Sequence, residues 1–311
     1  MGRTGYDQRQ LNARKKRTFA AAMLILIAVP VTLLAGCFLL DRANHMLISL
    51  LVIIYTMIPF FMIFEKRRPK AREIVLIAMM TAITVACHMF FNMTLSIIEI
   101  GTTMVIIAGI AMGPEAGFLV GALARFVCNF FLSQGPWTPW QMFCWGLLGF
   151  LAGLTFSIDK TTAKSSRFHV VMGPVMCIFA AVILVYVTYL IAPGSDESFW
   201  GWRIYAAGAV GLLAGLLLQR KRMPTDRITL TLFTFLTTVI IYGGILNAAS
   251  MFTMAGMPGT EISWNTLRLL YISGLPYDLL HAGTAALCML LMGRPMIEKI
   301  ERIKIKYGVY R

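Results

Sequence analysis

Polar side chains that interrupt long apolar stretches are the residues of this sequence with the clearest chemical potential. Those within such stretches are His88, Asn92, Arg125, Asn129, Asn247, Asp278 and His281. In a helix that crosses a membrane, a charge such as that of Arg125 costs about 2.5–3.5 kcal/mol even on lenient scales, so it has to face the protein and be paired. Groups of this kind commonly line substrate paths or ligand sites.

The spacing of these residues arranges them in pairs. Arg125 and Asn129 are four residues apart, as are His88 and Asn92, and side chains at that spacing share one face of a helix. Each pair can therefore present polar groups to the same region. A purely structural alternative is an ion pair between Arg125 and Asp278 with satisfied hydrogen bonds around it, although such a pair can itself flank a site.

A proline–tryptophan turn separates two of the apolar stretches, at Ser133–Trp145 (SQGPWTPWQMFCW). Proline donates no backbone hydrogen bond and restricts the residue before it, so the turn is stiff. Trp137, Trp140 and Gln141 then belong either to an interfacial aromatic belt or to one wall of a ligand site. Trp145 lies deeper in the following stretch, where packing is the simpler expectation.

We expect these polar and aromatic side chains to converge, because all of them fall near the middle of the bundle or in its outer half. The expected cavity opens to the outside and is lined by His88, Asn92, Arg125, Asn129, Trp137, Trp140, Gln141, Asn247, Asp278 and His281. The cytoplasmic halves of the stretches are expected to carry almost no buried polar groups.

Helices must position these residues. Hydrophobic residues make up 58% of the sequence and charged residues only 14%, and the apolar runs are long enough to span a bilayer. Lipid offers backbone groups no partner, so each run must be helical, and the alternating pattern of a β-barrel is missing. The predicted fold is an all-α integral membrane protein with about ten transmembrane helices. Their ranges are Phe19–Leu40, His45–Phe64, Glu73–Phe91, Leu95–Met112, Ala116–Leu132, Trp140–Ile158, Val170–Ile191, Ile204–Leu218, Ile228–Met254 and Pro276–Met292.

Basic residues indicate how the helices are oriented. The net charge is +14, and all 28 lysines and arginines except Arg42, Arg125, Arg203 and Arg268 fall in five clusters. The clusters are Met1–Arg17, Lys66–Arg72, Lys160–Arg167, Arg220–Arg227 and Arg294–Arg311. Basic clusters on alternate loops are the positive-inside pattern, which places both termini in the cytoplasm and explains the charge without nucleic acid. Attraction to the acidic head groups of the lipid bilayer is a secondary consequence.

Glycines at every fourth position predict close helix contacts, because flat faces let backbones approach in lipid. Gly113, Gly117 and Gly121 form one series, and Gly149 and Gly153 form another. Both series are expected inside the bundle.

Enzymatic motifs are missing from the sequence. It has neither a Gly-x-x-x-x-Gly-Lys-Ser/Thr phosphate loop nor a Gly-x-Ser-x-Gly nucleophile elbow. His88, His281, Asp278 and Glu99 come from separate stretches and lack the spacing of a metal site. No catalytic residue, metal ion or cofactor is therefore predicted, and the chain is expected not to be an enzyme. Two other classes stay open: a stand-alone secondary transporter, and an intramembrane enzyme acting on a lipid or isoprenoid.

Three blocks of the sequence resemble the S component of energy-coupling factor (ECF) transporters. They are Ala124-Arg125-Phe126…Asn129-Phe130-Phe131 with Gly135–Met142 and Gly146…Gly149…Ala152-Gly153; Gly274–His281 with Gly293–Met296…Glu298-Lys299; and Ala78-x-x-x-Ala82. The resemblance covers roughly 73–158 and 228–311. It is closest to the branch assigned to cobalamin and related corrinoids, although riboflavin, another vitamin or a modified nucleobase would fit the same scaffold.

The resemblance implies a substrate-binding subunit of a prokaryotic cell membrane. Such a subunit binds a vitamin from outside and delivers it through a transmembrane coupling (T) subunit and two ABC ATPases, which hydrolyse the ATP. The series Ala78, Ala82 and Ala86 would dock on the coupling subunit. The implied division is residues 1–64 for the basic N-terminus and an extra hairpin, 65–72 for a basic cytoplasmic linker, 73–158 for the first four of six core helices, 159–227 for an inserted helix pair, and 228–311 for the last two core helices and a basic tail.

Overall fold

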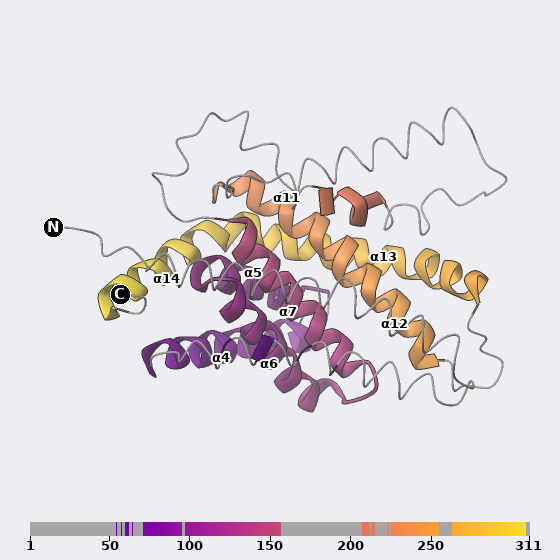
Figure 1. Ribbon diagram of the computed structural model, residues 1–311, viewed down its shortest axis with the longest axis horizontal. Helices are drawn as coiled ribbons and strands as arrows, with labels where there is room; N and C mark the ends of the chain where they lie inside the picture. The colour runs from indigo at the N-terminus through magenta and orange to yellow at the C-terminus, as the bar shows by residue number, and fades with distance from the viewer. Residues whose placement is uncertain are drawn as a thin grey trace, which may run out of the picture.

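The computed structural model describes residues 54, 57, 60, 61, 64, 71–94, 97–156, 207–211, 213, 214, 223, 225–254 and 263–308. The regular structure of these residues is helical apart from one isolated bridge between Phe156 and Met223 (Figure 1). The predicted all-α class is therefore confirmed for this part of the chain. The predictions that lie wholly or mostly outside it are the N-terminal hairpin Phe19–Phe64, the linker 65–72, and the helices Val170–Ile191 and Ile204–Leu218.

The described helices follow one another through two compact groups. The first group is α4 (Ala71–Thr94), α5 (Ile100–Met112), α6 (Pro114–Leu132) and α7 (Thr138–Thr155). The second is α11 (Arg227–Thr237), η4 (Thr238–Gly243), α12 (Gly244–Met254), α13 (Trp264–Cys288), η5 (Met289–Gly293) and α14 (Arg294–Tyr307). The π-helical turns η4 and η5 each continue one α-helix into the next, so α11 to α12 and α13 to α14 are unbroken.

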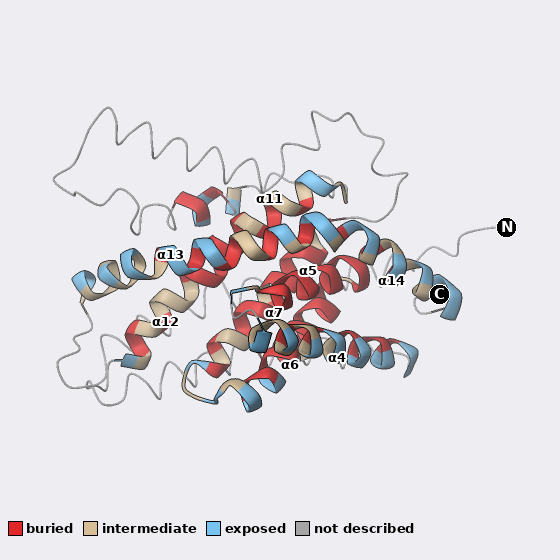
Figure 2. Ribbon diagram, turned by 180° about the vertical axis from the view of Figure 1, so that it is seen from behind, coloured by how far each residue is buried: buried red, intermediate tan, exposed pale blue. Residues whose placement is uncertain are grey.

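The short helix α5 is the core of the bundle. Every one of its 13 residues is buried, and α4, α6, α7, α13 and α14 pack around it (Figure 2). At 1.5 Å per residue it is about 20 Å long, less than the roughly 30 Å of a bilayer's hydrocarbon core. The helix predicted at Leu95–Met112 is wrong at its start, because residues 97–99, directly before α5, are not helical.

Glycine faces let α5, α6 and α7 approach to backbone contact. A Cβ atom added to Gly109 would lie 2.0 Å from the carbonyl oxygen of Gly149, and one added to Gly117 would lie 2.5 Å from the Cα of Gly109. Gly113 joins α5 to α6 with a φ of 98°, a conformation that glycine adopts without strain. The glycine series predicted to pack inside the bundle do so.

Four described helical segments are long and apolar enough to cross a membrane. They are Ala71–Thr94, Pro114–Leu132, Arg227–Met254 and Trp264–Tyr307. These segments support a multi-pass membrane protein.

The last helix begins earlier than predicted. It starts at Trp264 and not at Pro276, which lies inside it. The start signal is Ser263, whose Oγ accepts a hydrogen bond from the backbone N–H of Thr266 at 3.1 Å and so caps the helix. Proline favours the first turn of a helix, which explains the wrong boundary.

Candidate functional site

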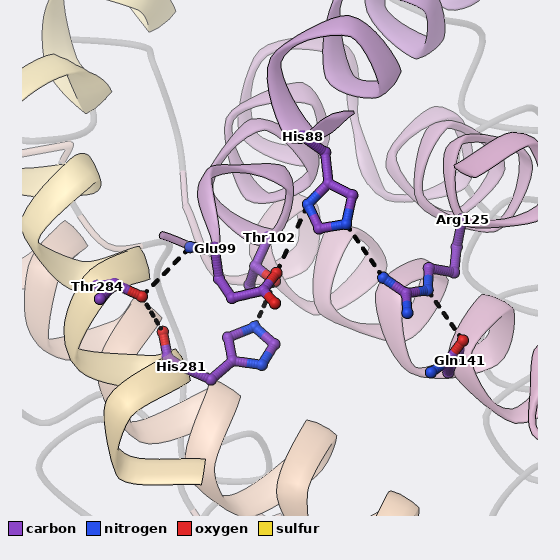
Figure 3. Close-up of polar contacts among 7 residues, drawn as sticks. All are labelled: His88, Glu99, Thr102, Arg125, Gln141, His281 and Thr284. Atoms are coloured by element: carbon purple, nitrogen blue, oxygen red, sulfur yellow. Dashed lines mark hydrogen bonds and ion pairs between the residues drawn. The ribbon is translucent and has the colours of Figure 1, made fainter. Parts of the chain in front are cut away.

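Arg125, on α6, is the centre of a row of buried polar contacts. Its Nε donates to Gln141 Oε1 on α7 at 3.0 Å, and its Nη1 lies 3.3 Å from His88 Nε2 on α4. The other ring nitrogen of His88, Nδ1, lies 3.6 Å from Oε2 of Glu99, in the turn before α5. Figure 3 shows these side chains following one another from Gln141 to Glu99, and we call these four residues the Arg125 chain.

The tautomer of His88 follows from its neighbours. An arginine side chain can only donate, so His88 Nε2 must accept from Arg125. In a neutral imidazole the proton is then on Nδ1, which faces Glu99. Burial raises the pKa of the Glu99 carboxyl, and Arg125 and a hydrogen bond from Tyr277 partly offset this effect. His88 thus separates a buried cation from a buried acidic group.

Trp145 forms one wall of the Arg125 chain. The guanidinium carbon of Arg125 lies 5.1 Å from the centre of the indole ring, and the His88 ring meets it edge-on with centroids 5.0 Å apart. The indole is fully buried. A cation over an indole face is stabilised by the ring's quadrupole. The sequence-based expectation that Trp145 only packs therefore missed its contact with Arg125.

A second group of polar contacts meets the Arg125 chain at Glu99. The backbone N–H of Glu99 donates to Thr284 Oγ1 at 3.3 Å, and Thr102 Oγ1 lies 2.8 Å from His281 Nε2 (Figure 3). The ring of Tyr242, in the π-helical turn η4, lies 4.4 Å from the His281 ring. Such π turns occur frequently at functional sites. The two groups together bring residues of α4, α5, α6, α7 and α13 to one place.

The proline–tryptophan turn is tied to the Arg125 chain through Asn129. Asn129 Nδ2 donates to Gln141 Oε1 at 2.9 Å and to Thr138 Oγ1 at 3.0 Å. The two tryptophans of the turn behave differently: Trp137 is 43% exposed, whereas Trp140 is 3% exposed and its ring is parallel to that of Phe252 at 6.5 Å. Trp137 fits the belt hypothesis, and Trp140 packs between helices.

Asp278 has a different partner from the one considered in the sequence. Asn247 Nδ2 donates to Asp278 Oδ2 at 2.8 Å, whereas Arg125 donates to Gln141 and His88. An Arg125–Asp278 ion pair is therefore not the arrangement seen. Of the ten predicted lining residues, the structure joins His88, Arg125, Asn129 and Gln141 directly, brings His281 to the same region through Thr102, and places Asn247 with Asp278 in a separate contact. Asn92 is half-buried near the end of α4.

Glu99, Thr102, Trp145, Tyr242 and Thr284 belong to the site but were not among its predicted residues. Threonine is common in apolar helices, where it bonds to its own backbone, so Thr102 and Thr284 carried no signal. Glu99 follows an apolar stretch, a position at which the sequence predicts an acidic side chain in a solvent-exposed loop. Its burial depends on the position of α5 in the bundle, which local sequence does not show.

Buried polar groups also occur at the opposite end of the first helices. Glu73 and Glu115, in the first turns of α4 and α6, are 7% and 8% exposed. Acidic side chains are favoured there by the positive end of the helix dipole. On the predicted orientation this is the cytoplasmic end, and there the expectation of almost no buried polar groups does not hold.

Several polar atoms around the Arg125 chain lack hydrogen-bond partners among the described residues. They are Trp145 Nε1 and His281 Nδ1, together with His88 Nδ1 and Glu99 Oε2, which face each other at 3.6 Å without a hydrogen bond; all four are buried. Buried polar groups in proteins are nearly always satisfied, and exceptions call for a water, an ion or a ligand group. Their concentration at one place favours a binding site over a purely structural ion-pair network.

Residues 68–199 match a known protein family. That family is described as the S component of the ECF-type riboflavin transporter. The matched segment includes α4 to α7 and with them the whole Arg125 chain. The match supports an ECF S component, a membrane subunit of a transport system. No curated protein and no solved structure gave a significant match.

Proposed function

We propose that the chain is the substrate-binding S subunit of an ECF importer in a prokaryotic cell membrane, and that it recognises a vitamin-class molecule at the Arg125 chain. The group of buried, unpartnered polar atoms around this chain carries the proposal. It lies among the helices that match the S-component family. Transport would require a T subunit and two ABC ATPases, the partners that an ECF-type importer implies.

The chemistry of the site favours an uncharged ring system. Arg125 and Glu99 offer one cation and one acidic group, so a ligand without net charge leaves them balanced. Trp145 Nε1 is a donor without a hydrogen-bond partner among the described residues, and Glu99 Oε2 accepts no hydrogen bond there, with His88 Nδ1 in ion-pair contact at 3.6 Å. A heterocycle with both donors and acceptors on its edge would satisfy these atoms.

Packing limits the side from which a ligand can reach the site. Backbone contact at Gly109, Gly117 and Gly149 closes the space between α5, α6 and α7. A ligand would therefore have to part α4 or α13 from this unit. A flat flavin requires a smaller separation than a corrinoid, and the matched family is one of riboflavin transporters. Riboflavin is thus the first ligand to test, and cobalamin, suggested by the sequence resemblance, is the second.

Direct titration tests the proposal. The purified chain, without nucleotide or partner, should quench riboflavin fluorescence saturably, and cobalamin should be titrated by its absorbance in parallel. Mass spectrometry of small molecules that co-purify with the chain covers other vitamins. Absence of any bound ligand would count against an S subunit. Uptake driven by membrane potential without an ATPase would favour a secondary transporter, and turnover by the isolated chain would favour an enzyme.

The exposed face of α4 is proposed to dock on the coupling subunit. Ala78, Ala82 and Ala86 are all exposed, beside Val75 and Met79, which are 58% and 46% exposed. Small side chains on such a face permit close approach of a partner helix.

Ala78→Trp or Ala82→Trp should abolish ATP-dependent uptake while leaving ligand affinity unchanged, because the exposed face of α4 lies away from the Arg125 chain. Uptake in vesicles, co-purification with the T subunit and ligand titration check this. Leu287→Trp, at an exposed position of α13, is the matched control and should affect none of them. A variant that loses ligand binding but keeps its partner would show that the docking face is misassigned.

A further inference from the structure

The helix that ends the described chain is too long for a bilayer. Segments α13, η5 and α14 form one continuous helix of 44 residues. At 1.5 Å per residue it extends about 66 Å, more than twice the roughly 30 Å of the hydrocarbon core. Leu287 and Leu291, before α14, are 55% and 69% exposed, as expected of side chains that contact lipid. The basic helix α14 therefore follows a lipid-facing segment and lies where the helix leaves the core.

The charges of α14 divide into paired and unpaired ones. Arg294 Nε lies 3.1 Å from Glu298 Oε1, and Lys304 Nζ lies 2.8 Å from Glu301 Oε2. Lys304 also donates to the carbonyl oxygen of Ala111 at the end of α5. Both acidic groups of the helix are thus matched by a cation within it.

Three further cations of α14 are exposed: Lys299, Arg302 and Lys306. No ion pair to them occurs within the described part of the chain. Their spacing of three and four residues places them on one face. The buried Ile297 and Ile300 hold the other side of α14 against the bundle. The result is a fixed row of three cations, which we call the α14 basic row.

Other basic residues lie at the same end of the molecule. Arg72, at the start of α4, donates from Nη1 to the carbonyl oxygen of Tyr307 at 2.8 Å. Arg227 is the first residue of α11, and α11 packs against η5. Figure 1 shows α14 near the beginnings of α4 and α11. Tyr307, 55% exposed, is the kind of side chain that is enriched at the membrane–water interface.

We propose that the α14 basic row binds the head groups of acidic phospholipids at the face where this helix leaves the bilayer. Charge complementarity and direct continuity with lipid-exposed Leu287 and Leu291 favour lipid over a protein partner. Bound lipid would hold α14 at the interface and, through Lys304 and Ala111, fix the end of the core helix α5. The proposal is independent of the ligand at the Arg125 chain.

Lipid enrichment in nanodiscs tests the α14 basic row. The full chain is reconstituted with equal amounts of phosphatidylglycerol and phosphatidylcholine, and the lipids retained after re-extraction are quantified by mass spectrometry. The wild type should enrich phosphatidylglycerol, and each neutralised cation in K299Q/R302Q/K306Q should lower the enrichment about fivefold at low salt. About 0.5 M salt should reduce the wild-type enrichment as well.

Two control variants separate charge from fold. K299R/R302K/K306R keeps the three charges and should retain the lipid, whereas R294Q/E298Q removes a matched pair from the same helix and should change nothing. Equal phosphatidylglycerol enrichment in the wild type and the neutralised variant overturns the proposal. So does a neutralised variant that retains the lipid but no longer associates with a coupling subunit, since the row would then be a protein-docking surface.

Discussion

Replacing Arg125 with methionine should weaken ligand binding at least about 100-fold and destabilise the protein by about 3–5 kcal/mol, the usual cost of leaving a buried charge uncompensated, here the Glu99 carboxylate. Methionine fills a similar volume but donates no hydrogen bond. Gln141 would lose a donor, His88 Nε2 would lose its partner, and Glu99 would lose the cation that offsets its burial. Ligand titration and thermal unfolding in detergent measure the two effects separately.

A double variant distinguishes a binding role from a structural one. E99Q/R125M removes both charged groups, so most of the stability lost in R125M should return. Ligand binding should stay weak, because the guanidinium donors of Arg125 and the negative charge of Glu99 are both gone. R125K keeps the charge without the planar fork and should bind with intermediate affinity. Wild-type affinity in the double variant would mean that the Arg125 chain only supports the fold.

The sequence was sufficient to predict the site residues whose type is unusual for their position. A charged or amide side chain in an apolar helix is costly to expose to lipid, so it has to face other polar groups of the protein. Arg125, Asn129 and His88 could therefore be predicted to meet inside the bundle. The glycine series was equally informative, because small side chains at helical spacing have a direct packing consequence. Gln141, which the proline–tryptophan stretch places in the first turn of α7, was predicted as well.

The remaining features depend on tertiary arrangement. Glu99 is buried because α5 lies inside the bundle, and Trp145 meets Arg125 because Gly101 leaves room for its indole ring. Asp278 pairs with Asn247 because the helices α12 and α13 lie side by side there, which the charge pattern alone did not distinguish from pairing with Arg125. The cap at Ser263 is a local signal that was outweighed by Pro276.

The backbone contact between α5 and α7 leads to the second prediction with a large expected effect. Gly109→Ala should lower the yield of folded protein and reduce thermal stability by about 1–3 kcal/mol or more, because overpacking displaces backbone and not merely a flexible side chain. The added Cβ would lie 2.0 Å from the carbonyl oxygen of Gly149, so α5 has to move. Since Glu99 precedes α5 directly, the same movement should separate it from His88 and weaken ligand binding.

Gly283 provides the matched control for Gly109→Ala. It lies inside α13, and a Cβ added there meets nothing within 4 Å. Gly283→Ala should therefore leave ligand binding unchanged and raise stability by up to about 1 kcal/mol, since alanine is the better helix former. Thermal unfolding and ligand titration of both variants under identical conditions compare the same substitution at two positions. At Gly109 the added methyl group meets backbone, and at Gly283 it meets empty space. If the two variants unfold at the same temperature and bind equally well, the tight α5–α7 contact does not position the site, and Glu99 must be held by Thr284 and α13 instead.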